Sequence, residues 1–281
     1  MTVFRVMNYV GTLLSHRQRR FLLDRLGLGR IVSRLAAGEF EEVALPGGMT
    51  LSINPLLHAH IATDGKLVYE EHVLKAIEDN LGSADTFYDI GANVGVFSIM
   101  AAGRVGEAGA VHAFEPEENN LACLRRSLRQ SGLANVTLHA CAVGAADGSM
   151  TFDRRGGAFS GRLVGPGEDA HGASVEVKVR SIDSLIEEGL PPPSLVKIDV
   201  EGGEGGVLEG MRRTLERHGP TVLCELHAFN LAGVRQTLDV LTEAGYVCRG
   251  LDGEELPSNA SGSEMPHHIV AAPASGASRR S

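Results

Sequence analysis

Residues 87–97, which read FYDIGANVGVF, constrain the fold of this chain more than any other stretch. An apolar run enters the pattern Asp-x-Gly-x-Asn-x-Gly and a second apolar run leaves it, which predicts a buried strand, a tight turn and the first turn of a helix. Glycines at 91 and 95 permit positive φ values, and a helix N-terminus offers N–H groups to a ligand above the loop. The carboxylate that closes the strand is expected to point into the crevice. The stretch predicts a nucleotide-binding loop formed by Asp89, Gly91, Ala92, Asn93 and Gly95.

A second acidic residue follows at the distance that an adenosine site needs. The short apolar run at 110–114 ends at Glu115-Pro116, 20 positions after Gly95. A carboxylate that closes the second strand of a βαβ unit at about this distance can accept hydrogen bonds from both ribose hydroxyls. We therefore predict that Glu115 and Pro116 belong to the cofactor site.

Two adenosine cofactors suit this geometry: a dinucleotide such as NAD, and S-adenosylmethionine. A dinucleotide places its pyrophosphate on the loop, which favours Gly-x-Gly-x-x-Gly with no carboxylate immediately before it. In this chain Asp89 occupies that point and Asn93 replaces the middle glycine. Because Asp89 would repel a pyrophosphate but can pair with the ammonium of a methionine moiety, the sequence favours S-adenosylmethionine.

Three motifs resemble those of the FkbM family of S-adenosylmethionine-dependent O-methyltransferases. They lie at 87–95, at 114–116 (FEP) and at 196–204 (VKIDVEGGE), and the third is the most specific. The resemblance extends roughly from Tyr69 to Ala272. It implies an α/β class I methyltransferase fold, with a Rossmann-like seven-stranded, mostly parallel sheet, and methylation of a hydroxyl on a sugar, glycolipid or polyketide-type small molecule. It also implies that Ala142 lies beside the adenine, and it makes Tyr69 and Glu70 candidates for the cleft.

Strands and helices alternate from residue 86, as in a parallel doubly wound sheet. The strands are expected at 86–90, 109–114, 135–140, 195–200 and 221–227, the helices at 94–104, 117–131 and 230–244, and an edge of two further strands at 246–251 and 267–272. The methyltransferase domain is expected to cover 69–272, with an inserted hairpin and loop at 149–180. A helix at 69–81 is expected to pack over the entrance of the cleft. An N-terminal helical cap and a hairpin occupy 1–68, and 273–281 is a disordered tail.

Charged residues gather where the fourth and fifth strands end. Alternation along a strand puts Lys197, Asp199 and Glu201 on one face, and it does the same for Glu225 and His227 on the next strand. Burying such groups has a desolvation cost without a matching structural benefit, which predicts that all five are catalytic and that Asp199 also touches the cofactor. His227 is the preferred general base because its unperturbed pKa lies nearest neutrality, and Asp199 or Glu201 is the alternative.

The sequence shows no convincing metal-binding motif. The four cysteines, Cys123, Cys141, Cys224 and Cys248, include no Cys-x-x-Cys pair and are expected to be free thiols, while His58 and His60 lack a third ligand. In a second version of the mechanism, a divalent cation on Asp199, Glu201 and Glu225 lowers the pKa of the acceptor hydroxyl.

Composition excludes some classes of protein. A net charge of −9 with only four lysines argues against a general nucleic-acid binder. No stretch approaches the roughly 20 apolar residues of a membrane span, and the N-terminus lacks a secretory signal, so a cytoplasmic protein is expected.

Residues 1–40 carry seven arginines against two acidic residues, and helices there are expected to cap the domain, form a homo-oligomer contact or touch a membrane surface.

Two rival functions remain open. A nucleotide-dependent oxidoreductase is disfavoured by Asp89 and Asn93 at the loop. A non-catalytic cofactor-binding protein is disfavoured by the intact acidic set at 199, 201, 204 and 225.

Overall fold

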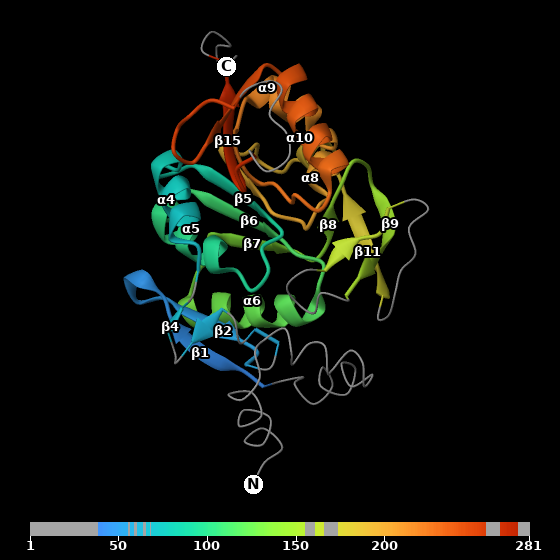
Figure 1. Cartoon of the computed structure of the whole chain (residues 1–281). Coiled ribbons are helices and arrows are strands. Elements are labelled where there is room, and N and C mark those ends of the chain that lie inside the picture. The colour runs from blue at the N-terminus through green and yellow to red at the C-terminus, as the bar shows by residue number, and fades with distance from the viewer. Residues whose placement is uncertain are drawn as a thin grey trace.

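The computed structural model describes residues 39–55, 57, 58, 61–63, 66, 67, 69–154, 161–165, 174–256 and 265–274 (Figure 1). The predicted N-terminal helices, His60, most of the loop inside the insertion and nearly all of the C-terminal tail lie outside these residues. None of the helices that the structure describes is long and apolar enough to cross a bilayer.

A seven-stranded sheet forms the centre of the structure (Figure 1). Its strands are β5 (Thr86–Ile90), β6 (Ala110–Phe114), β7 (Val136–His139), β12 (Leu195–Ile198), β13 (Thr221–Glu225), β14 (Tyr246–Gly250) and β15 (His268–Pro273). They lie in the order β14-β15-β13-β12-β5-β6-β7, with β15 antiparallel to both of its neighbours and the other pairs parallel. This arrangement confirms the predicted class I methyltransferase fold. The order reverses between β5 and β12, which opens a crevice at the carboxyl ends of these strands.

Both faces of the sheet are covered by helices, so the inner strands carry mostly apolar side chains on both faces. Phe87, Leu195 and Leu223 pack on one side against α4 (Glu71–Asn80) and α5 (Val96–Val105). Tyr88 and Val196 pack on the other side, where the helices are α7 (Ile182–Glu187), α8 (Glu204–Glu209), α9 (Arg212–His218) and α10 (Leu231–Glu243). The expectation that the helix at 69–81 covers the cleft entrance is wrong for α4, which packs on α5 and on the sheet and contributes no residue to the cavity described below.

The predicted hairpin before the domain is present as β1 (Glu41–Ala44) and β2 (Thr50–Ile53), joined by a turn at Pro46–Gly48. It is followed by two short strands, β3 (Ala62–Thr63) and β4 (Lys66–Leu67). The hairpin packs on α6 (Glu118–Ser131), where the Ser52 amide donates to Ser127 Oγ at 2.8 Å. His58 is buried between Asn54 and Asn120, at 3.0 and 2.9 Å from its two ring nitrogens, and burial lowers its pKa to about 4. This histidine therefore has a structural role.

The insertion forms a small sheet of its own. The predicted hairpin consists of β9 (Gly148–Asp153) and β11 (Ser174–Arg180), with β10 (Arg162–Leu163) added outside β9. The strand β8 (Ala142–Val143), which the sequence analysis did not predict, runs parallel to β11 and joins the insertion to the main domain. Asp147 accepts from the Ser181 amide at 2.8 Å and pairs with Arg180, which ties the turn before β9 to the end of β11.

Candidate active site

A cavity of about 470 Å³ lies at the carboxyl edge of the sheet, where the strand order reverses. This volume is in the range of about 300–1,000 Å³ that is usual for small-molecule sites. Its lining residues come from the loop after β5, the end of β6, α6, β8 with the turn after it, the insertion, the loop after β12 with the start of α8, and the first half of α10. Of the predicted site residues, those at the surface of the cavity are Gly91, Asn93, Glu115, Pro116, Ala142, Asp199 and Glu201.

The glycine loop after β5 is held closely against its neighbours. A Cβ at Gly91, whose φ is 80°, would lie 1.8 Å from the carbonyl oxygen of Asp199. The amides of Gly91 and Ala92 both donate to the Phe114 carbonyl at 3.0 Å, and the Asn93 amide donates to Glu115 Oε2 at 2.8 Å. These three N–H groups are therefore used within the protein, and the loop presents a fixed surface to the cavity.

Glu115 sits at the end of β6 with 4% of its surface exposed. Its second oxygen, Oε1, accepts from the Glu117 amide at 2.8 Å. Burial raises the pKa of this carboxyl to about 8, against the opposing effect of the hydrogen bond from Asn93. Because a carboxylate oxygen can accept more than one hydrogen bond, both oxygens retain capacity for a ligand in the cavity.

An apolar wall continues from Glu115 toward the insertion. It is formed by side chains from β6, β8, β9 and β10, namely Phe114, Ala142, Val143, Phe152 and Leu163. A planar base can lie against such a wall while backbone groups of β8 meet its edge. The predicted insertion therefore borders the same cavity as the predicted cofactor residues.

Asp89 does not face this cavity, so the expectation that its carboxylate points into the crevice is wrong. The residue is fully buried, and its Oδ2 accepts from Ser98 Oγ of α5 at 2.5 Å. Its Oδ1 lies 3.7 Å from Lys197 Nζ, because the register of the two parallel strands places Lys197 directly beside it. Burial raises the pKa of Asp89. Ala92 and Gly95 also stay out of the cavity, Gly95 as the residue that precedes α5.

Lys197 is the buried cation of the carboxyl edge, with 5% of its surface exposed. Its Nζ lies 3.3 Å from Asp199 Oδ2, in addition to its contact with Asp89. Burial on its own would raise the pKa of Asp199, but the charges of Lys197 and His227 outweigh this effect and lower it. Asp199 therefore presents an ionised carboxylate to the cavity.

Glu201 reaches the site by a route that the sequence pattern did not predict. The strand β12 ends at Ile198, so strand alternation does not place this side chain. Instead the backbone turns through a left-handed conformation, with φ values of 57° at Glu201 and 95° at Gly202. A left-handed non-glycine residue is a strained feature that is common at functional sites. Burial, reinforced by the charges of Asp199 and Glu225, raises the pKa of Glu201 to about 7.

His227 follows the end of β13 and lies among four carboxylates. Its Nδ1 donates to Glu204 Oε1 at 2.9 Å, and Glu204 is itself fixed by the Gly202 amide at 2.9 Å. The other ring nitrogen, Nε2, lies 3.6 Å from Glu201, 3.7 Å from Glu225 and 3.9 Å from Asp199. Burial alone would lower the pKa of His227, but the hydrogen bond that it donates to Glu204 and the surrounding negative charges raise it to about 9. The imidazole is therefore positively charged at neutral pH.

The structure thus brings together all five predicted catalytic residues, although only Asp199 and Glu201 line the cavity. Asp199, Glu225 and His227 also have ligand atoms close enough together to hold a cation, a set that overlaps the one proposed in the metal version of the mechanism.

Sequence reasoning missed several residues of this edge. Asn230 lines the cavity, caps α10 through the Gly233 amide at 3.1 Å and donates to the Gly202 carbonyl at 2.7 Å. Its position before an apolar helical run is a capping signal that could have identified it. His268 has no such signal, because only the pairing of β15 with β13 places it opposite Glu225.

Comparison with known sequences agrees with this geometry. A sequence model of the methyltransferase FkbM domain matches residues 89–248, which is more than half of the chain. The chain belongs to the FkbM methyltransferase family. Every predicted catalytic and cofactor-binding residue lies inside the matched region.

Two curated relatives in this family carry more specific names. The chain is 28% identical over 160 residues to the hexuronic acid methyltransferase AglP of Haloferax volcanii, in an alignment that covers 57% of this chain and 63% of AglP. It is 29% identical over 224 residues to the 31-O-demethyl-FK506 methyltransferase FkbM of Streptomyces tacrolimicus, with coverages of 66% and 82%. The chain therefore spans a little less than two thirds of AglP.

A solved FkbM methyltransferase structure is also similar to this chain. The crystal structure of the protein from Methylobacillus flagellatus has a TM-score of 0.44 and 21% identity, over 67% of this chain and 43% of that one.

Proposed function

We propose that the protein transfers a methyl group from S-adenosylmethionine to a hydroxyl of a small molecule of the sugar or polyketide type. The observation that carries the proposal is that one cavity is lined both by the glycine loop with Glu115 and by Asp199 with Glu201. Membership of the FkbM family supports methyl transfer. The name of the 31-O-demethyl-FK506 methyltransferase supports a hydroxyl acceptor, and that of the hexuronic acid methyltransferase supports an acceptor of the sugar type.

The residues of the cavity fit an adenosine cofactor with a positively charged sulfonium. Glu115 offers two carboxylate oxygens to ribose hydroxyls, and the wall from Phe114 to Phe152 suits an adenine ring. The ionised carboxylate of Asp199 lines the same cavity and favours a positive charge there. When bound, S-adenosylmethionine supplies an electrophilic methyl carbon.

The chain itself needs to hold the acceptor hydroxyl in line with that carbon and accept its proton. We propose Glu201 as the proton acceptor, because it lines the cavity and its pKa of about 7 suits a base at neutral pH. The sequence favoured His227, but a pKa of about 9 keeps this imidazole protonated at pH 7, and it lies behind the carboxylates that line the cavity. In this arrangement His227, oriented by Glu204, positions Glu201 and compensates its charge.

A transfer assay with labelled S-adenosylmethionine tests the proposal. A glycoside that contains a hexuronic acid and a macrolide with a free hydroxyl serve as acceptors. Glu201→Gln should lower turnover by about 10²–10⁴-fold, the usual effect of losing a general base, while the affinity for S-adenosylmethionine stays nearly unchanged in calorimetry. Glu216→Gln, at an exposed position of α9, is the matched control.

The pH dependence gives a further test. The base is active when deprotonated, so the wild-type rate should rise with pH through about pH 7, and Glu201→Gln should lack this rise. Wild-type turnover in Glu201→Gln would refute the assignment of the base. Activity that is lost on chelation and restored by Mg²⁺ would assign the proton step to a cation on Asp199 and Glu225. Absence of S-adenosylmethionine binding would refute the proposed function.

A further inference from the structure

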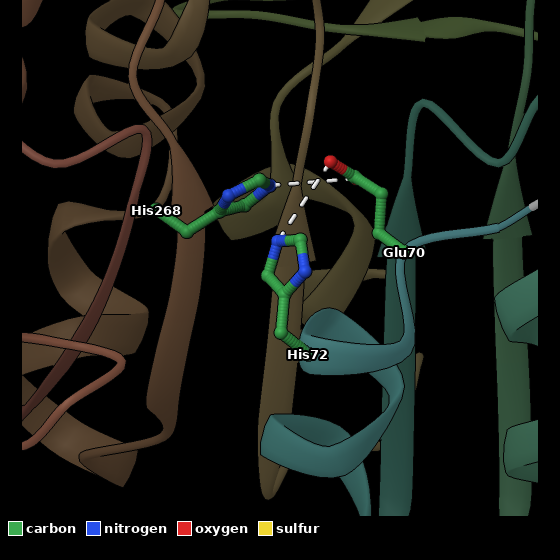
Figure 2. A group of neighbouring side chains, drawn as sticks. All are labelled: Glu70, His72 and His268. Carbon is green, nitrogen blue, oxygen red and sulfur yellow. Dashed lines mark ion pairs between the residues drawn. The ribbon is translucent and has the colours of Figure 1, made fainter.

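Glu70, His72 and His268 converge at the carboxyl edge of the sheet, outside the cavity (Figure 2). Glu70 immediately precedes α4, and His72 is the second residue of that helix. His268 is the first residue of β15, the antiparallel strand next to β13. Two parts of the chain almost 200 positions apart therefore supply one carboxylate and two imidazoles to the same point.

The spacing of these groups is that of ligands around an ion. Nε2 of His268 lies 3.6 Å from Glu70 Oε2, and Nε2 of His72 lies 3.8 Å from Glu70 Oε1. Both distances exceed the 2.7–3.2 Å of an ordinary N–H···O hydrogen bond. They approach the separation of about 3.3–3.4 Å that two ligands have when each is about 2.0–2.1 Å from a tetrahedral metal ion. One ligand atom from each of the three residues lies within 4.8 Å of the others.

We propose that Glu70, His72 and His268 bind a divalent first-row transition-metal ion such as Zn²⁺. Two imidazole nitrogens and one carboxylate are a ligand set used by zinc and by other metals of this row, and three protein ligands leave positions for water. The two rings meet edge to face with their centroids 5.1 Å apart, and both direct Nε2 toward the Glu70 carboxylate (Figure 2).

Burial and charge around the three residues favour the same conclusion. The His268 side chain is 8% exposed and is fixed by its strand, whereas those of Glu70 and His72 are 47% and 56% exposed. A metal ion can therefore enter from solvent, and two of the ligands can shift to meet it. Glu225 Oε2 lies 3.6 Å from His268 Nε2 and adds a second negative charge that attracts a cation.

Glu70, His72 and His268 all lie outside the region 89–248 matched by the FkbM model. A bound ion would join the start of α4 to the start of β15. Glu225 would connect this ion to the carboxylates around His227, because Glu225 Oε1 lies 3.7 Å from His227 Nε2.

Metal binding can be measured on the full-length, untagged protein without S-adenosylmethionine or acceptor, so failure of the proposed function leaves this test intact. Zn²⁺ titration by calorimetry and metal analysis after gel filtration should give one ion per chain. His72→Ala and Glu70→Gln alter half-exposed side chains, so the fold should be retained, and each should weaken Zn²⁺ binding by at least about tenfold. His218→Ala, an exposed histidine at the end of α9, should bind Zn²⁺ like the wild type.

The neighbouring group of Asp199, Glu225 and His227 is the competing location. If Asp199→Asn abolishes Zn²⁺ binding while His72→Ala and Glu70→Gln retain it, the ion belongs to that group and the proposal is overturned. A wild-type protein that binds no Zn²⁺ would overturn it as well. Co²⁺ in place of Zn²⁺ should give a visible absorption band that His72→Ala removes, and persistence of the same band in this variant would contradict the ligand assignment.

Discussion

Two parts of the cavity wall, which we name the cofactor end (around Glu115) and the acidic end (around Glu201), hold buried carboxylates by different means. At one end, Glu115 is fixed by the backbone amides of Asn93 and Glu117, at 2.8 Å each. At the other end, Glu201 is surrounded by charged side chains. Its Oε2 lies 3.6 Å from His227 Nε2, and the charges of Asp199 and Glu225 also act on it. Burial raises the pKa of both groups, to about 8 and about 7. The first end is therefore built by backbone geometry and the second by a balance of charges.

This difference has consequences for how each end responds to substitution. Where backbone amides hold the carboxylate, substituting that residue should lower the affinity for the ligand and leave the rest of the fold intact. A site held by buried charges should lose stability when one charge is removed, since the remaining charges have lost their compensation.

The largest effect is expected for Lys197→Met. The substitution leaves the fully buried carboxylate of Asp89 without its cation and removes the cation beside Asp199. Removing one partner of a buried ion pair typically costs about 3–5 kcal/mol, and denaturant unfolding should show a loss of this size. Lys75→Met, in an exposed pair with Asp79, is the matched control and should have little effect. Equal free energies of unfolding for the two variants would mean that the charge balance around Lys197 does not stabilise the acidic end of the cavity.

An intermediate effect is expected for Glu115→Gln. The amide keeps the shape of the side chain but replaces one acceptor oxygen with a donor, so S-adenosylmethionine should bind more weakly by about 1.5–3 kcal/mol in calorimetry above pH 8, where the carboxyl of Glu115 is ionised. Glu118→Gln, whose side chain is 74% exposed in the first turn of α6, should bind the cofactor like the wild type. Unchanged affinity in a folded Glu115→Gln variant would remove Glu115 from the ribose site.

The smallest effect is expected for Phe229→Ala. This side chain is 68% exposed, and its ring centroid lies 5.3 Å from that of His227, beside the acidic end of the cavity. An acceptor ring that stacks on it should gain about 0.5–1.5 kcal/mol, so the substitution should raise KM for the acceptor several-fold and leave kcat nearly unchanged. Leu231→Ala, also exposed, is the control. A loss of kcat with unaltered KM would place Phe229 in the proton-transfer end instead.

The sequence by itself determined the local structure around the glycine loop and Glu115, and the parallel part of the sheet. The strand, the glycine turn, the helix and Glu115 come from two segments separated by a single helix, and their apolar periodicity and spacing are local properties of the chain. The strand pattern from 86 onward predicted the parallel sheet and two further strands at its edge, which the structure confirms. The predictions for the N-terminal helices, the oligomer contact and the cytoplasmic location remain predictions.

Only the tertiary structure decided which charged groups face the cavity and which are protonated. Asp89 turns away because Lys197 on the adjacent strand lies beside it, and Glu201 turns inward because the chain leaves β12 through a left-handed turn. His227 acquires a raised pKa from Glu204 on α8, and His268 reaches Glu70 only after β15 pairs with β13. Each of these outcomes depends on distances between residues far apart in the chain, and electrostatic energy falls with distance in space rather than with separation in sequence.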